Sequence, residues 1–278
     1  MDIIEVLKAV LFGVVEGITE WLPISSTGHL IILENLLDVR RSYGDEYWNL
    51  FLVMVQLGAI LAVVAVFFSE LSPIKKQRLE RFGIYKLWLK ILIAIIPSVI
   101  LGLLFDDFIE SKLYNAVGVS TALIFFGIIF IIIESFIKKR SKRNANVNEI
   151  SYCHAFIIGL FQAIAIIPGI SRSGITIFGA MLLLYNKSTS AKFSFYLSIP
   201  TMLGASVLKL IKFYLSGYIL ESSGVYFMLI GCVTACLVSL LVIRILFSYI
   251  NKHSFNVFGY YRIVLGIIIL ILYLNNII

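Results

Sequence analysis

Six uninterrupted runs of apolar residues constrain the fold of this chain more than any other feature of its sequence. Each run has about 20 residues, the length that an α-helix needs to cross the hydrocarbon core of a bilayer. Only 14% of the residues are charged and the mean hydropathy is +0.99, against roughly 25% charged residues in soluble domains. The sequence therefore predicts an all-α polytopic membrane protein, with full transmembrane helices at approximately 47–68, 85–105, 115–137, 190–213, 225–248 and 256–275.

The basic residues are confined to alternate loops. The chain has 23 Lys and Arg against 16 Asp and Glu, a net charge of +7, which could suggest a nucleic-acid partner. However, the basic residues gather in 69–90 and 138–151, whereas the loops 106–114 and 214–224 contain a single Lys between them. The positive-inside rule accounts for this pattern by placing the two basic loops in the cytoplasm. We therefore expect membrane lipids, and no nucleic acid, as partners.

Two further apolar segments, 3–37 and 152–185, are too interrupted to span a membrane. The interruptions read Pro-Ile-Ser-Ser-Thr-Gly-His at 23–29 and Pro-Gly-Ile-Ser-Arg-Ser-Gly at 168–174, and the second is a degenerate repeat of the first at an offset of 146 residues. Proline stops a helix, and hydroxyl side chains cap the next one. Because irregular backbone at membrane depth must be buried in protein or face a cavity, we predict two re-entrant helical hairpins, whose second helices are capped by Ser26 or Thr27 and by Ser171 or Ser173.

The loop charges give the two hairpins opposite orientations, the first entering from outside and the second from the cytoplasm. The predicted fold is one integral membrane domain, 1–278, built as an inverted-topology repeat of the kind found in transporters. Its first half covers about 1–137, a basic cytoplasmic linker covers 138–151, and its second half covers about 152–278. Glycines within helices, including Gly204, are expected to permit close helix contacts inside the protein or in a homodimer.

Ionisable side chains are concentrated at the two interruptions. Glu16 and Glu20 are four residues apart and share one helical face. Since a charged side chain at the bilayer centre costs about 2.5 to 3.5 kcal/mol, this pair, His29 and Arg172 need partners. One interpretation is a structural ion pair between a glutamate and Arg172. The other is an anion site, because the interruptions carry more hydroxyl groups than caps require, and helix N-termini with an arginine bind phosphate.

A phosphate beside two carboxylates would require a divalent cation, and magnesium or calcium suits such oxygen ligands. The combination is typical of phosphoryl transfer. Ser26, His29 or a metal-activated water could attack phosphorus. If the second helix begins near Thr27, His29 lies on the same face as Ser26 and could accept its proton, while Glu20 orients or deprotonates the imidazole.

Two long motifs resemble those of the bacterial undecaprenyl-diphosphate phosphatase family associated with bacitracin resistance. They are Glu-x-x-x-Glu with Pro-x-Ser-Ser-Thr-Gly-His at 16–29, and Pro-Gly-x-Ser-Arg-Ser-Gly-x-Thr at 168–176. The resemblance covers essentially the whole chain. It implies a metal-assisted hydrolase of the bacterial plasma membrane that converts undecaprenyl diphosphate into undecaprenyl phosphate, the lipid carrier for cell-wall synthesis. It also implies an active-site cleft that opens to the external side.

The resemblance implies a role for each motif residue. The catalytic residues would be Glu20, Ser26, His29 and Arg172; the metal ligands Glu16 and Glu20; and the substrate-binding residues Ser25, Thr27, Gly28, Ser171, Ser173, Gly174 and Thr176. The main alternative is a flippase for undecaprenyl phosphate, because inverted repeats with broken helices also build carriers. A membrane scaffold with a structural polar core is a third reading. Phosphate release from a polyprenyl diphosphate distinguishes the hydrolase from both.

Overall fold

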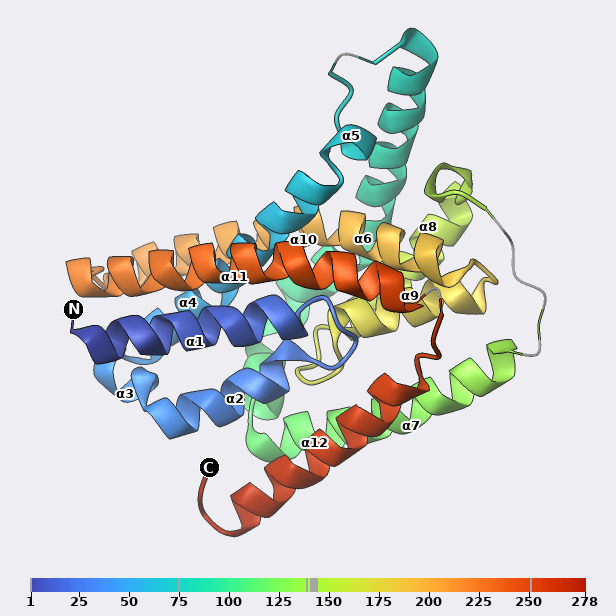
Figure 1. Cartoon of the computed structure of the whole chain (residues 1–278). Coiled ribbons are helices and arrows are strands. Elements are labelled where there is room, and N and C mark those ends of the chain that lie inside the picture. The colour runs from blue at the N-terminus through green and yellow to red at the C-terminus, as the bar shows by residue number, and fades with distance from the viewer. Residues whose placement is uncertain (1, 75, 139, 141–144, 251) are drawn as a thin grey trace.

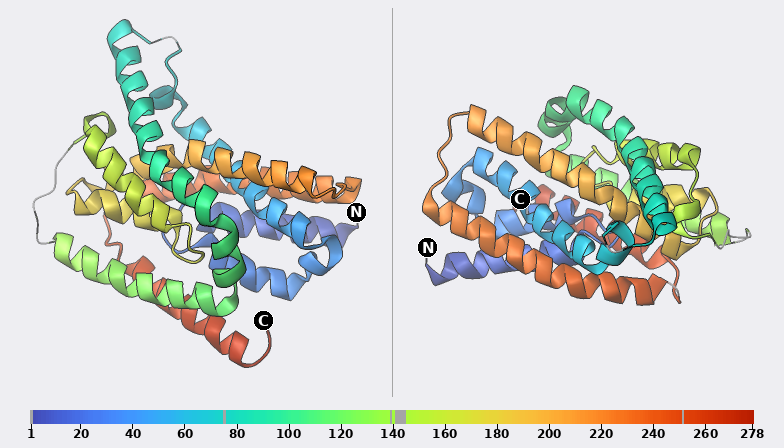
Figure 2. Two further views of the ribbon diagram at one scale, coloured as in Figure 1. Left: turned by 180° about the vertical axis from the view of Figure 1, so that it is seen from behind. Right: turned by 90° about the horizontal axis from the view of Figure 1, so that it is seen from above.

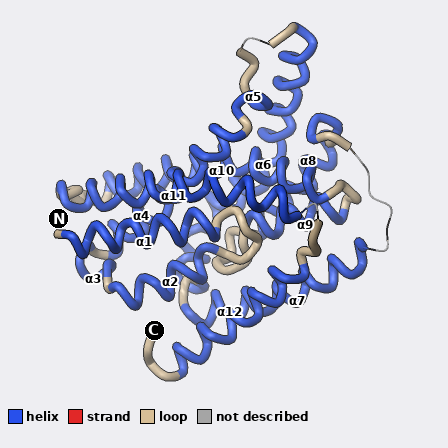
Figure 3. Tube along the Cα trace, viewed as in Figure 1, coloured by secondary structure: helices blue, strands red, loops and turns tan. Residues whose placement is uncertain are grey.

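The computed structural model describes residues 2–74, 76–138, 140, 145–250 and 252–278. Lys75 and part of the predicted basic linker, residues 139 and 141–144, lie outside the described residues. All regular structure in the described ranges is helical (Figure 3). In chain order the elements are α1 (Ile3–Thr19), α2 (Ser26–Leu37), α3 (Val39–Tyr43), α4 (Asp45–Val66), α5 (Phe68–Leu71), α6 (Arg78–Leu113), α7 (Ala116–Lys138), the 3-10 helix η1 (Val147–Glu149), α8 (Tyr152–Ile164), α9 (Arg172–Leu182), α10 (Lys187–Leu215), α11 (Ser222–Ile250) and α12 (Asn256–Leu274).

Six of the described helices are long and apolar enough to cross a membrane, namely α4, α6, α7, α10, α11 and α12. They coincide with the six apolar runs, so the prediction of a helical multi-span membrane protein is confirmed. Helix α6 is 36 residues long, well beyond the roughly 20 that a span requires. Its N-terminal part continues through the basic stretch and projects away from the other helices (Figure 1).

The interrupted segments form two helix pairs, α1 with α2 and α8 with α9. Helices α1 and α8 end at Thr19 and Ile164, several residues before the prolines that were expected to stop them. The N-cap of α2 is Ser25, whose side chain makes no capping bond, so the prediction of Ser26 or Thr27 as the cap is wrong. The N-cap of α9 is Ser171, which accepts a bond from the amide of Gly174, as predicted.

The two cap residues share an unusual backbone conformation. Ser25 has φ 71° and ψ 103°, and Ser171 has φ 69° and ψ 105°. Positive φ is uncommon outside glycine, and such strained residues persist only when the surrounding structure holds them. The same strain therefore occurs at positions that correspond in the sequence repeat.

The packing of the long helices is reciprocal between the two halves of the chain. Helix α1 of the first half packs on α11 of the second, and α8 of the second half packs on α6 of the first. Helix α4 packs on α10, and α7 packs on α12 (Figure 2). Small residues allow these close approaches. A Cβ on Gly13 of α1 would lie 2.5 Å from the carbonyl oxygen of Gly231, and one on Gly127 of α7 would lie 2.9 Å from that of Gly259. The expected close helix contacts thus occur within one chain.

The connections inside the two helix pairs meet in the interior of the protein. The hydroxyl of Ser173, at the start of α9, donates to the carbonyl oxygens of Glu20 at 3.0 Å and Leu22 at 3.4 Å. Both acceptors lie between α1 and α2. The tertiary fold therefore joins the two sequence motifs into one polar cluster.

Candidate active site

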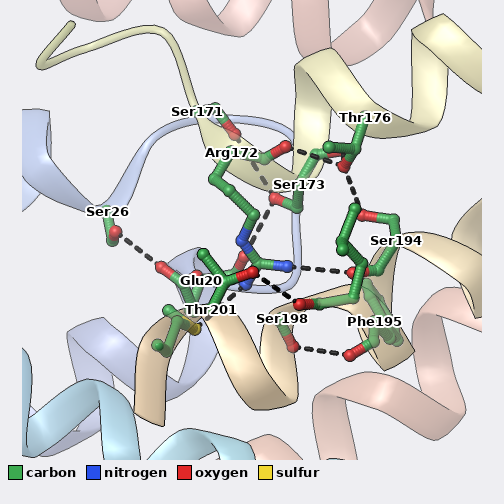
Figure 4. A network of polar contacts seen from close by, with 12 residues as sticks. Glu20, Ser26, Ser171, Arg172, Ser173, Thr176, Ser194, Phe195, Ser198 and Thr201 are labelled. Carbon is green, nitrogen blue, oxygen red and sulfur yellow. Dashed lines mark hydrogen bonds and ion pairs between the residues drawn. The ribbon is translucent and has the colours of Figure 1, made fainter. Parts of the chain in front are cut away.

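Glu20 lies at the centre of this cluster and joins the two helix pairs. It follows the last residue of α1 and its side chain is 7% exposed. One carboxylate oxygen accepts a hydrogen bond from the hydroxyl of Ser26 at 2.9 Å, and the other is paired with the guanidinium of Arg172 at 2.8 Å (Figure 4). The carboxylate thus contacts the first residue of α2 and the first residue of α9 at once.

Arg172 is held by two separate parts of the chain, the end of α1 and α10. Besides Glu20, its guanidinium donates to the carbonyl oxygen of Ser194 at 3.1 Å and to the sulfur of Met202 at 3.2 Å, both on α10. It also lies 5.8 Å from the ring centroid of Trp21. A buried guanidinium is stable only when paired and hydrogen-bonded. These contacts fix the charge of Arg172 at the N-terminus of α9, where the helix dipole also favours an anion.

A cavity of about 580 Å³ opens beside the ion pair. It is polar at this end, where Gln162 of α8 donates to the hydroxyls of Ser98 and Thr201 at 2.8 and 3.1 Å. Its other walls come largely from α6 and α10, whose lining side chains are mostly apolar but include Asp106 and Lys209. The cavity contains seven of the residues predicted for the site, Glu20, Ser25, Ser26, Thr27, Ser171, Arg172 and Ser173.

The remaining predicted residues do not line this cavity and instead support it. Thr176 shares a 2.5 Å hydrogen bond with the hydroxyl of Ser194 and donates to the carbonyl oxygen of Arg172 at 2.8 Å. A Cβ on Gly174 would lie 2.7 Å from the ring of Phe130. The residues outside the cavity lining are Glu16, Gly28, His29, Gly174 and Thr176. For Gly174 and Thr176 the contacts indicate a role in placing α9.

The predicted proton relay from Ser26 through His29 to Glu20 is not formed. The Nδ1–H of His29 donates to the carbonyl oxygen of Ser25 at 2.8 Å, and its Nε2 lies 2.7 Å from the hydroxyl of Tyr261. In the neutral imidazole, Nε2 accepts a hydrogen bond from the hydroxyl of Tyr261. Because α2 begins at Ser26, the serine hydroxyl reaches the end of α1, and the carboxylate of Glu20 takes the place expected for the imidazole.

Glu16 supplies the observation that bears on a metal ion. Its side chain is 0% exposed, and neither carboxylate oxygen has a hydrogen-bond partner among the described residues. Uncompensated buried oxygens are costly. Glu20 follows one turn later, directly after the end of α1. The carboxylate oxygens of Glu16 and Glu20 are ligands of the kind that magnesium and calcium prefer. The described part of the chain contains no cluster of three His, Cys, Asp or Glu residues. The donors therefore fit a cation that completes its coordination with phosphate oxygens and water, as magnesium does.

Arg262 was missed by the sequence analysis. It lies on α12 with 0% exposure and donates to the carbonyl oxygens of Ile170 at 2.7 Å and Gly169 at 2.9 Å. Its guanidinium stacks 4.7 Å from the ring centroid of Phe130. These contacts hold the connection that precedes the N-cap of α9. The available signal was that an ionisable residue inside an apolar run is a functional candidate by default, but Arg262 lies far from both motifs.

The sequence profile of a family described as "Bacitracin resistance protein BacA" matches residues 9–268, which include both motifs. The chain belongs to the BacA family. It is also similar over nearly its full length to proteins named "Undecaprenyl-diphosphatase". The one from Enterococcus faecalis is 45% identical over 276 residues, covering 98% of both chains. The one from Streptococcus thermophilus (strain ATCC BAA-250 / LMG 18311) is 49% identical over 270 residues, covering 96% of this chain and 93% of the relative. The one from Lachnoclostridium phytofermentans is 47% identical over 271 residues, covering 97% of each chain.

The polar cluster of this BacA-family chain is therefore built from both family motifs. The first motif supplies Glu20 and Ser26, and the second supplies Arg172. Their side chains form one connected set of contacts at the polar end of the cavity (Figure 4). Neither motif forms this cluster alone.

Proposed function

We infer that this chain is an undecaprenyl-diphosphatase of the bacterial membrane. It hydrolyses undecaprenyl diphosphate to undecaprenyl phosphate and inorganic phosphate, and so recycles the lipid carrier for cell-wall synthesis and confers resistance to bacitracin. Family membership and the shared name of its relatives support this reaction. The observation that carries it is the contact between the Ser26 hydroxyl and the Glu20 carboxylate, beside Arg172 and inside a cavity.

Ser26 acts as the nucleophile in this proposal. A serine hydroxyl attacks only when a neighbouring base takes its proton, and the Glu20 oxygen that accepts its hydrogen bond is 2.9 Å away. The Ser26 oxygen forms a bond to the terminal phosphorus, the bond from that phosphorus to the bridging oxygen breaks, and Glu20 takes the serine proton. Undecaprenyl phosphate leaves. Glu20 then passes the serine proton to solvent. A water molecule attacks the phosphoserine, Glu20 takes a proton from it, the bond from phosphorus to the Ser26 oxygen breaks, and Glu20 returns the proton to that oxygen as inorganic phosphate is released.

Positive groups around Ser26 stabilise the charge that develops in this step. Arg172 offers the planar guanidinium that binds phosphate through paired hydrogen bonds. The N-termini of α2 and α9 add amide groups that lack an acceptor within their own helix. Ser25, Thr27, Ser171 and Ser173 line the same end of the cavity and would bind the diphosphate oxygens. Preorganised donors of this kind supply most of the catalytic effect in phosphoryl transfer.

Glu16 and Glu20 would hold a magnesium or calcium ion. When bound, the ion neutralises diphosphate charge and polarises the phosphoryl group. Glu16 is suited to this role because it is buried one turn before Glu20 and its carboxylate oxygens accept no hydrogen bond from the described residues.

We further propose that the two halves form an inverted repeat with re-entrant hairpins. Three observations support it: α2 and α9 begin at positions 146 residues apart, their cap residues share one strained conformation, and the helix packing is reciprocal. The cavity reaches Asp106 and Lys209, near the ends of α6 and α10, which the loop charges assign to the external side. An active site that opens externally and a homodimer remain predictions.

The test is phosphate release from undecaprenyl diphosphate by the purified protein in detergent, with magnesium or calcium and with EDTA. We expect release by the wild type, loss with EDTA, and loss in Glu20→Gln and Arg172→Ala variants that remain folded. Mass spectrometry of Ser26 after rapid quenching should detect phosphoserine. A folded, metal-supplied wild type that releases no phosphate, but moves undecaprenyl phosphate across vesicle membranes, would establish the flippase instead.

A further inference from the structure

The cavity that contains Ser26 and Arg172 is open at its side. Four apolar residues line it and are also about half exposed on the outer surface of the protein: Val99 (46%) and Leu103 (67%) on α6, and Val207 (49%) and Ile211 (51%) on α10. A side chain that both lines a cavity and is exposed on the outer surface stands at its opening. Because α6 and α10 are both candidate membrane spans, this opening faces the lipid.

Two glycines lie on opposite sides of the same opening. Gly102 of α6 and Gly204 of α10 both line the cavity, and a Cβ added to either would meet no atom of the described residues within 4 Å. Gly58, which corresponds to Gly204 in the sequence repeat, differs sharply because its Cβ would lie 2.6 Å from the Cα of Cys232. The expectation that Gly204 permits a close helix contact is therefore wrong within this chain. In the first half the glycine admits a neighbouring helix, and in the second it leaves a gap.

The chemistry of the cavity fits an amphipathic ligand with an anionic head. Arg172 and the hydroxyl groups form the polar part of the cavity, and the rim at Val99, Leu103, Val207 and Ile211 is apolar. A volume of about 580 Å³ matches the pocket of a drug-sized ligand. A polyprenyl chain is much longer than such a ligand, so most of it has to leave the cavity. At this apolar rim the tail meets apolar side chains, whereas an exit past Asp106 and Lys209, which also line the cavity, would desolvate charged groups.

We propose that the polyprenyl tail of the substrate leaves the cavity sideways between α6 and α10, through a portal whose two walls are Gly102 and Gly204. The diphosphate then reaches Ser26 while the tail stays in the bilayer. This inference rests on the proposed function and adds to it the path of the lipid. It also gives the two glycines at positions 102 and 204 a selective role. The space left by their lack of a side chain matters only for ligands long enough to pass through the portal.

The matched variants are Gly102→Leu and Gly204→Leu, with Gly83→Leu as control. Gly83 also lies on α6 with no atom within 4 Å of an added Cβ, but it does not line the cavity. Leucine favours helix over glycine, so none of the three is expected to weaken folding. Each variant is assayed for phosphate release from undecaprenyl diphosphate in mixed micelles and from a short, water-soluble isoprenyl diphosphate.

For the long substrate we expect kcat/KM to fall about tenfold or more in both portal variants. This is the scale of the cost when a side chain is forced into space that the polyprenyl tail has to occupy. For the short substrate, and for Gly83→Leu with either substrate, we expect changes of less than about twofold. Equal losses on both substrates, or no loss on the long one, would overturn the portal.

A second measurement is independent of hydrolysis. A polyprenyl phosphate with a photoreactive group on its first isoprene units should label peptides of α6 and α10 in the wild type, and this labelling should fall in Gly204→Leu. Labelling of other helices alone would overturn the portal. Labelling of α6 and α10 by a protein that releases no phosphate would retain the portal and refute the phosphatase, so the two inferences fail in different ways.

Discussion

The ion pair between Glu20 and Arg172 offers a way to separate a structural role from a catalytic one. The two side chains are 7% and 12% exposed and 2.8 Å apart. We expect Arg172→Met alone to leave the carboxylate buried without its cation, whereas Glu20→Leu with Arg172→Met replaces the pair by apolar side chains. The two variants should therefore differ in stability but have the same consequence for chemistry.

The magnitudes follow from the contacts. Removing one partner of a buried pair costs about 3 to 5 kcal/mol, whereas replacing both by apolar residues is often neutral. In the double variant the Ser26 hydroxyl also loses its acceptor, which costs roughly 1 to 3 kcal/mol. We therefore expect Arg172→Met to lower the free energy of unfolding by about 3 to 5 kcal/mol, and the double variant, which still carries the cost at Ser26, to recover about 2 kcal/mol of that loss.

Denaturant unfolding in detergent, followed alongside phosphate release, measures both properties. The expected result is a recovered free energy of unfolding with no phosphate release from the double variant. A stable double variant that releases phosphate at the wild-type rate would refute the catalytic role and leave a structural ion pair. If Arg172→Met alone unfolds like the wild type, the energetic argument for the buried pair is wrong.

Three further predictions concern neighbouring residues. Ser26→Ala should lower kcat by at least about 100-fold with little change in unfolding, because the nucleophile is lost; a wild-type kcat in steady-state assays would remove Ser26 from the chemistry. His29→Phe, which keeps a ring against Tyr261 but no hydrogen bonds, should reduce stability by about 1 to 3 kcal/mol and lower turnover less than Ser26→Ala does; an equal loss of turnover in a fully folded protein would restore His29 as the proton acceptor or nucleophile. Arg262→Lys keeps the charge but cannot place two parallel donors on the carbonyls of Gly169 and Ile170, so we expect kcat to fall by about 10-fold or more with a smaller change in KM. The same substitution at Arg244 is the control, and unchanged kinetics in Arg262→Lys would show that the two hydrogen bonds of the Arg262 guanidinium do not position α9.

The six spans could be predicted from sequence because each is a local property. A helix in lipid must satisfy its own backbone bonds within about 20 apolar residues, and α4 or α7 meets that requirement without reference to the rest of the chain. The two motifs could be identified as a polar site for a related reason, because carboxylates and an arginine in apolar segments need a compensating partner. The residue types of the site followed from this, and an ion pair between a glutamate and Arg172 was one interpretation, but which glutamate it would be and the contact of Ser26 with Glu20 did not follow.

Long-range contacts decided the pairing. Ser26 is closer in sequence to His29, yet its hydroxyl bonds to Glu20, because the start of α2 is folded back onto the end of α1. Arg262 binds the connection before α9 from a helix about 90 residues away in sequence. Neither contact follows from periodicity, since both depend on how the connections between helices are folded.

The sequence by itself determined that this chain is a helical membrane protein with a duplicated polar motif, since hydrophobicity and charge act on each segment separately. Only the tertiary structure decided which carboxylate meets Ser26 and Arg172, and where the cavity opens. It also decided that Gly58 admits a helix while Gly204 leaves a gap. These outcomes arise from the packing of segments far apart in the chain, and two equivalent residues in a repeat can meet different neighbours.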